Sequence, residues 1–159
     1  MPLTKHQQEI RARCLYMAGY MIGHEWLEGY SEARPYARPK WKPTRYFTND
    51  CSGTLKLLFE WCGAPSPDGE AWGYGNTATL VTHGWNPGLN PSRWQPMDYV
   101  FYGNPWAGGP GGHVAMLTHK DDRGRWHVVS HGSERGPKDE LAHYRTPVAV
   151  RRYRIPAKG

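Results

Sequence analysis

The stretch TNDCSGTLKLLFEWCG, residues 48–63, places a cysteine directly after two residues that favour helix N-termini. Asn49 or Asp50 can cap a helix here, and the apolar residues that follow recur with helical spacing. We therefore expect a helix from about Cys51 to Trp61. Its first turn would surround the cysteine sulfur with free N–H groups and the positive end of the helix dipole, which predicts a lowered thiol pKa. A lone cysteine is more often a buried small apolar residue, so this position needs partners before it indicates catalysis.

Helical patterns also stand on either side of this stretch. Apolar residues recur with a period near 3.6 from Ile10 to Trp26, which predicts a helix from about Thr4 to Leu27. The basic and aromatic segment 30–47 contains three prolines and predicts an irregular but ordered arm. GNTATLVTHG, residues 75–84, predicts a third and shorter helix.

The pattern changes to strands in the second half of the chain. Four short runs rich in β-branched or aromatic residues are separated by Gly, Pro and Asp. Helices followed by consecutive strands predict an α+β fold, with N-terminal helices packed on an antiparallel β-sheet. The four predicted strands are DYVFYG (98–103), HVAMLTHK (113–120), WHVVSHG (126–132) and PVAVRRYRI (147–155).

Length and composition limit the functions to consider. The 159 residues suit one domain, which we divide into an N-terminal helix (1–29), the irregular arm (30–47) and a core (48–155). The formal charge of +6 favours anionic partners such as nucleic acid, membrane or cell-wall polymer. No apolar run has the length of a signal peptide or membrane span, so we expect synthesis in the cytoplasm without a signal peptide and no membrane partner.

Two histidines lie on neighbouring predicted strands. The turn KDDRGR between these strands suits a hairpin centred near Asp122, in which paired residue numbers sum to about 244. His113 would then face His131, with Cβ atoms about 5 Å apart. One imidazole can fix the tautomer of the other, so Cys51, His113 and His131 form a candidate set of nucleophile, base and orienting residue. Each histidine alone is more often a surface or satisfied core residue.

Four motifs in this order carry a resemblance to a known family. NDCSGTLKLLFEWCG, PMDYVFYG, GGHVAMLTHK and WHVVSHGS resemble the NlpC/P60 family of papain-like cell-wall peptidases, over about Tyr36 to Ser133. The resemblance implies a papain-like NlpC/P60 fold with Cys51 as nucleophile, His113 as base and His131 as the third polar residue. The segments APSPDG (64–69) and GYGNTATLVTHG (73–84) resemble the peptidase modules of phage endolysins.

The family's upstream tyrosine has two candidates. Tyr36 is better spaced from the cysteine, and Tyr46 is the alternative, so the residue that completes the oxyanion site stays open. The remaining candidates for oxyanion or substrate binding are Asp50 and Ser52, which flank the nucleophile, and Trp41 in the arm. The arm's aromatic residues could stack on sugars or on nucleic-acid bases, and without a nucleic-acid motif we prefer the wall polymer.

The resemblance implies a monomeric peptidoglycan hydrolase that acts on the wall after release from the host cell. The amide cut would be the link between D-γ-glutamyl and the diamino acid of the stem peptide. An N-acetylmuramoyl-L-alanine amidase or an acyltransferase with the same residues is the alternative, and a non-catalytic wall- or nucleic-acid-binding module is a further one. His127 and His131 supply only two of the ligands that zinc needs, so we expect no metal and no cofactor.

Overall fold

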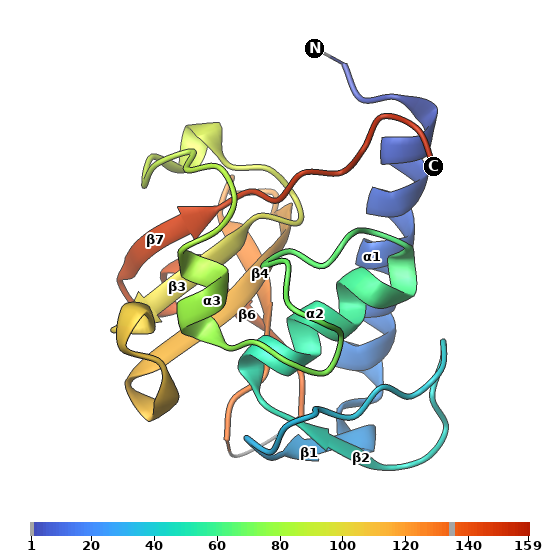
Figure 1. The fold of residues 1–159 in the computed structure, drawn as a ribbon. Helices are drawn as coiled ribbons and strands as arrows, with labels where there is room; N and C mark the ends of the chain where they lie inside the picture. Colours follow the sequence, from blue (N-terminus) through green and yellow to red (C-terminus); the bar gives the residue numbers. More distant parts are fainter. Residues whose placement is uncertain (1, 134–135) are drawn as a thin grey trace.

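Helices cover one face of a β-sheet in this computed structural model, which describes residues 2–133 and 136–159 (Figure 1). The helices are α1 (Lys5–Gly23) and α2 (Cys51–Cys62), and α2 packs against both α1 and the sheet. Five antiparallel strands form the sheet in the order β6-β5-β4-β3-β7. The predicted α+β fold is therefore confirmed.

Capping residues determine where the two long helices begin and end. The Thr4 hydroxyl accepts from the Gln7 amide N–H, and the Gln7 side chain accepts from Thr4 N–H, so both free donors at the start of α1 are satisfied. Its helical segment ends at Gly23, before the predicted Leu27, and continues as a short 3₁₀ turn. The end of α2 is set by Gly63, whose φ of 83° is costly for other residues.

Four of the five sheet strands are those that the sequence predicts. The fifth, β6, has the sequence KDEL, which lacks a run of β-branched residues, and it pairs with β5 at the edge of the sheet. The strands are β3 (Tyr99–Gly103), β4 (Gly112–Lys120), β5 (Trp126–Ser130), β6 (Lys138–Leu141) and β7 (Pro147–Arg151).

Alternate residues of β4 and β5 point to opposite faces of the sheet. Val114, Met116 and Val129 join the core between the sheet and the helices. Leu117 and Val128 join a second core on the other face. Since the side-chain period of a strand is two, a shift of one residue in pairing moves a side chain from one core to the other.

Two short parallel strands bring the end of the N-terminal segment beside α2. They are β1 (Glu28–Tyr30) and β2 (Phe47–Asn49), and their pairing places Tyr30 opposite Asn49. Between them, residues 31–46 contain neither helix nor strand, as predicted for the arm. The third predicted helix is observed as α3 (Thr77–Val81). The 3₁₀ segments are η1 (Glu25–Leu27), η2 (Pro91–Arg93), η3 (Pro105–Ala107), η4 (Gly109–Gly111) and η5 (Ala142–Tyr144).

A buried ion pair fixes the loop that follows α2. Lys56 Nζ lies 2.7 Å from Asp68 Oδ1 and donates to the Tyr74 carbonyl at 2.7 Å. Thr79 at the start of α3 donates to the other oxygen of Asp68 at 2.7 Å. These contacts hold the 66–79 segment against α2. Within the described ranges, no helix combines the length and apolar character needed to cross a bilayer.

Candidate active site

Cys51 occupies the first helical position of α2, at the floor of an open cleft. Asp50 is the N-cap, and its carboxylate accepts from Gly53 N–H at 2.8 Å and from the Ser52 hydroxyl at 2.9 Å. Only 7% of Cys51 is exposed. The cap therefore fixes the first turn of the helix so that the thiol reaches the cleft at one place.

Burial determines the protonation of this thiol. The pKa of Cys51 is raised to about 12, chiefly by burial and also by the negative charge of Asp50, whereas hydrogen bonds from backbone N–H groups and the charge of Arg34 oppose the shift. The lowered pKa expected from the helix N-terminus is therefore wrong, because desolvation outweighs the dipole. The thiol of Cys51 is therefore neutral near pH 7.

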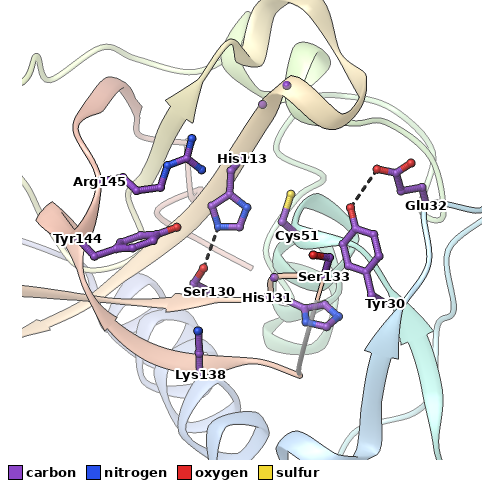
Figure 2. A pocket seen from close by; sticks show the side chains of 13 residues that line it. Tyr30, Glu32, Cys51, His113, Ser130, His131, Ser133, Lys138, Tyr144 and Arg145 are labelled. Carbon is purple, nitrogen blue, oxygen red and sulfur yellow. Dashed lines mark hydrogen bonds between the residues drawn. The ribbon is translucent and has the colours of Figure 1, made fainter.

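His113 lies beside Cys51, near the start of β4. Its Nε2 is 2.8 Å from Ser130 Oγ, and the other ring nitrogen lies on the side of the cysteine (Figure 2). The pKa of His113 is lowered to about 4, chiefly by burial and also by the nearby basic groups Arg145, His131 and Lys138. A neutral imidazole that donates to Ser130 through Nε2 has a free acceptor on Nδ1, where it can take the thiol proton.

The prediction that His131 contacts His113 is wrong, because the strand register differs by one residue from the expected one. The hairpin turn lies where expected, but the pairing of β4 with β5 shifts between Leu117 and His119, and beyond the shift Met116 pairs with Val129. Paired numbers there sum to 245 and not 244. Ser130 therefore shares the face of His113, and His131 points to the opposite face.

His131 is almost fully buried in the wall of the cleft. It is 1% exposed, and its Nε2 lies 2.9 Å from the Gly29 carbonyl oxygen and 3.8 Å from Glu28 Oε1. Its ring packs edge-on against Tyr30, with 5.9 Å between ring centroids. His131 thus joins the end of β5 to β1, and His113 Nε2 is hydrogen-bonded to the neighbouring Ser130.

The predicted aromatic residues of the arm lie away from the cleft. Tyr36 is 4% exposed with its ring against Gly53, and its buried hydroxyl has no hydrogen-bond partner in the described chain. Tyr46 is 67% exposed beside Gly29, and Trp41 stacks on Tyr16 with 6.0 Å between centroids. The predictions that place Tyr36, Tyr46 and Trp41 at the oxyanion or substrate site are therefore contradicted by these positions.

Tyr30 takes the place that was expected of those tyrosines. It borders the cleft next to Cys51, and its hydroxyl donates to Glu32 at 3.0 Å (Figure 2). The parallel pairing of β1 with β2 aligns Tyr30 with Asn49, two residues before the cysteine. Three-residue strands paired across the arm leave little periodic signal in the sequence, which explains why this residue was missed.

Two adjoining cavities, of about 680 and 520 Å³, form the cleft, and both include Tyr30 and Cys51. The larger extends past His113 to Ser130, Lys138 and Arg145. The smaller runs over Asp50, Ser52 and Arg34 toward α3. Asp50 and Ser52, two of the candidates for oxyanion or substrate binding, thus line the cleft.

Arg34 joins the arm to the first turn of α2. Its Nη2 donates to Asp50 at 2.9 Å and to the Ser52 hydroxyl at 3.0 Å, and its Nε donates to the Gly75 carbonyl at 2.8 Å. The arm therefore contributes charge to the cleft through this residue. No set of three potential metal-ligating side chains occurs in residues 2–133 and 136–159.

The helix-mounted cysteine beside a strand-borne histidine has the arrangement of an NlpC/P60-like fold. A solved structure of the peptidoglycan hydrolase RipB from Mycobacterium tuberculosis aligns with this chain at a TM-score of 0.56 and 18% sequence identity. The alignment covers 96% of this chain and 68% of the RipB chain. No family model matches the sequence, and neither does any curated protein. At this identity the likeness concerns the fold alone.

Proposed function

We propose that the protein is a cysteine hydrolase that cuts an amide bond in the stem peptide of peptidoglycan. The observation that carries the proposal is the juxtaposition of Cys51 and His113 in one open cleft, with His113 held by Ser130 at 2.8 Å. A peptidoglycan hydrolase shares the fold. Peptidoglycan also suits the charge of +6, since the polymer is anionic.

The protonation states suggest how the reaction begins. Cys51 and His113 are both neutral near pH 7. Burial raises the pKa of the thiol and lowers the pKa of the imidazole, so it disfavours the charged form of each. The thiol proton therefore passes to His113 as the sulfur attacks the substrate carbonyl. The new S–C bond creates a tetrahedral oxyanion. Only at this point are charges present, a negative one on the oxyanion and a positive one on the His113 imidazolium.

Collapse of the tetrahedral intermediate releases the amine. His113 gives the proton to the amide nitrogen as the C–N bond breaks, which leaves a thioester on Cys51. Water, deprotonated by the same imidazole, then attacks the thioester and restores the thiol. Ser130 accepts a hydrogen bond from Nε2–H throughout, so Nδ1 stays directed at the reacting atoms.

Backbone N–H groups at the start of α2 are suited to hold the oxyanion, because they are free of intrahelical partners. Tyr30 is the side chain best placed to assist them, since it borders the cleft beside Cys51, and its hydroxyl would exchange its hydrogen bond to Glu32 for one to the oxyanion. It replaces Tyr36 and Tyr46 in this role.

The bond that we propose is the amide between D-γ-glutamyl and the diamino acid. Mass spectrometry of digested peptidoglycan tests this choice, since an endopeptidase creates a new amino group on the diamino acid. A free N-terminal L-alanine on an intact stem peptide would instead show an N-acetylmuramoyl-L-alanine amidase. Transfer of the acyl group to an added amine would show an acyltransferase.

Cys51→Ala should abolish release of peptides, while Cys62→Ala should retain it. Cys62 lies at the other end of α2 and is buried, so its substitution controls for loss of a thiol from the same helix. Circular dichroism checks that both variants fold. Lysis by Cys51→Ala would refute the nucleophile and leave a wall-binding or nucleic-acid-binding module to consider.

The biological setting that we propose is that of a phage endolysin, a monomer made in the host cytoplasm that reaches the wall after release. The motif resemblance supports this setting. Lysis of host cells when the protein is added from outside, and its loss with Cys51→Ala, would agree with it.

A further inference from the structure

The two sides of Cys51 differ in charge. Beyond His113, the larger cavity is bordered by Lys138, Tyr144 and Arg145 (Figure 2). Across the cysteine stand Tyr30 and Glu32, and the smaller cavity there adds further carboxylates. A substrate that spans the cleft therefore meets cations at one end and a mixed, mostly acidic surface at the other.

The route of the proton determines which part of the substrate lies at the cationic end. His113 must reach the amide nitrogen to protonate the departing amine, so the residue that carries this amine lies on the His113 side of Cys51. The acyl part then extends the other way, past Tyr30 and Asp50. Lys138, Tyr144 and Arg145 consequently face the amine-side residue.

One buried ring organises this end of the cleft. Tyr102 pairs with His113 across β3 and β4, with 5.9 Å between their ring centroids. The Tyr144 ring packs edge-on against Tyr102 at 5.2 Å, and the Arg145 guanidinium lies 5.8 Å from the same ring. The Tyr102 hydroxyl donates to the Ala142 carbonyl at 2.7 Å, which anchors the ring. Tyr144 and Arg145 at the cationic end of the cleft therefore pack on the same Tyr102 ring as His113 does.

Arg145 is the cation at this end that is available to a ligand. Lys138 is 2.9 Å from Glu140, and on the acyl side Arg34 is bound to Asp50. In the part of the chain that the structure describes, Arg145 has no carboxylate within ion-pair distance, and it is exposed. A guanidinium with free donors binds a carboxylate through two parallel hydrogen bonds.

We propose that Arg145, with Tyr144 and Lys138, forms a carboxylate-binding subsite for the residue whose amine is released. This inference rests on the proposed hydrolysis of a stem peptide and specifies its substrate: a diamino acid with a free carboxylate, in preference to the carboxamide. Both Arg145 and Lys138 lower the pKa of His113, so a bound carboxylate would offset their charge and make the base stronger when substrate is present.

The test uses two γ-D-glutamyl-diaminopimelate peptides that differ only in the diamino acid, which bears carboxylates in one and carboxamides in the other. The wild-type protein should cleave the carboxylate peptide with a kcat/KM about tenfold higher. Arg145→Gln should lower kcat/KM for the carboxylate peptide by about tenfold and leave the carboxamide peptide nearly unchanged. Equal rates on the two peptides with wild type would overturn the subsite.

Arg123→Gln is the matched control, since it removes the same charge from the turn beyond the far end of β4, and the strand from His113 to that end is about 23 Å long. It should leave the ratio between the two peptides unchanged. An equal loss in both arginine variants would assign the effect to net charge and contradict the subsite.

A binding measurement separates this inference from the proposed reaction. Calorimetry with Cys51→Ala and free diaminopimelate should detect binding that Cys51→Ala/Arg145→Gln loses by about tenfold or more. Binding without any hydrolysis by the wild type would keep the subsite and reject the peptidase. Hydrolysis with no such binding and no carboxylate preference would do the reverse.

Discussion

The cleft and the layer directly beneath it each contain a histidine, and the two histidines differ in what their ring nitrogens contact. In the cleft, His113 is bound to Ser130 and borders Cys51. The buried layer consists of Glu28, Thr54 and His131, all at most 2% exposed. The comparison teaches that the contacts of the ring nitrogens, and not the residue type, separate a candidate base from a structural histidine.

The charge states of the two regions differ for the same reason. Burial lowers the pKa of His113 to about 4 in the cleft and raises the pKa of Glu28 to about 8 beneath it. Thr54 contacts both Glu28 Oε1 and the Asp50 carbonyl oxygen, and it has one hydroxyl proton for the two oxygens. A protonated Glu28 supplies the second proton, so both oxygens can be hydrogen-bonded and Glu28 itself is neutral.

Replacing each histidine in turn should produce the largest difference between the two regions. His113→Ala should lower the rate of peptide release by about 10³-fold or more, since it removes the group that moves the proton. His131→Ala should mainly lower the melting temperature, because it opens a hole between β5 and β1. Rates are compared per folded molecule, with the folded fraction taken from circular dichroism. A loss of similar size in folded His131→Ala would contradict this separation.

The sequence predicted most of the fold because its strands and helices carry strong local patterns. The helix beginning at Cys51 and four strands of the sheet follow from capping residues and β-branched runs. The partner of His113 depends instead on a shift of pairing between Leu117 and His119. No turn residue in the sequence indicates this irregularity. Because of it, Ser130 and not His131 contacts His113.

Tyr30 illustrates a second limit of local patterns. It reaches the cleft through parallel pairing with a strand that begins at Phe47, across an arm without regular structure. Such contacts depend on tertiary packing, so spacing from Cys51 favoured Tyr36, which is buried behind Gly53. Residues on the helix and sheet were predictable, and those delivered by the arm were not.

Substitution of Ser130 should have the next largest effect. Ser130→Ala removes the acceptor for His113 Nε2–H and should lower kcat by about tenfold to a hundredfold, the range seen when an orienting partner is lost. Ser130→Thr keeps the hydroxyl and should restore most of the activity. The acid limb of the pH–rate profile should also move in Ser130→Ala but not in Ser130→Thr. Equal activity in all three proteins would mean that Ser130 does not orient the base.

The buried layer should reveal itself in the pH dependence of stability. Glu28 keeps its proton in the folded state up to about pH 8, whereas an unfolded glutamate loses it near pH 4.3. Stability from this group is therefore complete below about pH 4 and is lost as the pH rises toward 8. Glu28→Gln is neutral at every pH, so relative to wild type its melting temperature should improve by about 5 °C between pH 5 and pH 8. Parallel curves for the two proteins would show that Glu28 is not the group responsible.

The smallest expected effect concerns the resting state of the cleft. A thiol with a pKa near 12 is almost entirely protonated at pH 7, and His113, with a pKa near 4, is almost entirely neutral. Removing the imidazole therefore removes no positive charge that stabilises a thiolate.

In the absence of substrate, iodoacetamide should alkylate Cys51 slowly at pH 7, and His113→Ala should change this rate by less than about threefold. Mass spectrometry of the intact protein follows the reaction, with Cys51→Ala correcting for the other two cysteines. A rate that falls more than tenfold in His113→Ala would instead indicate a thiolate–imidazolium pair at rest, and the cleft would then differ from the buried layer in charge as well as in exposure.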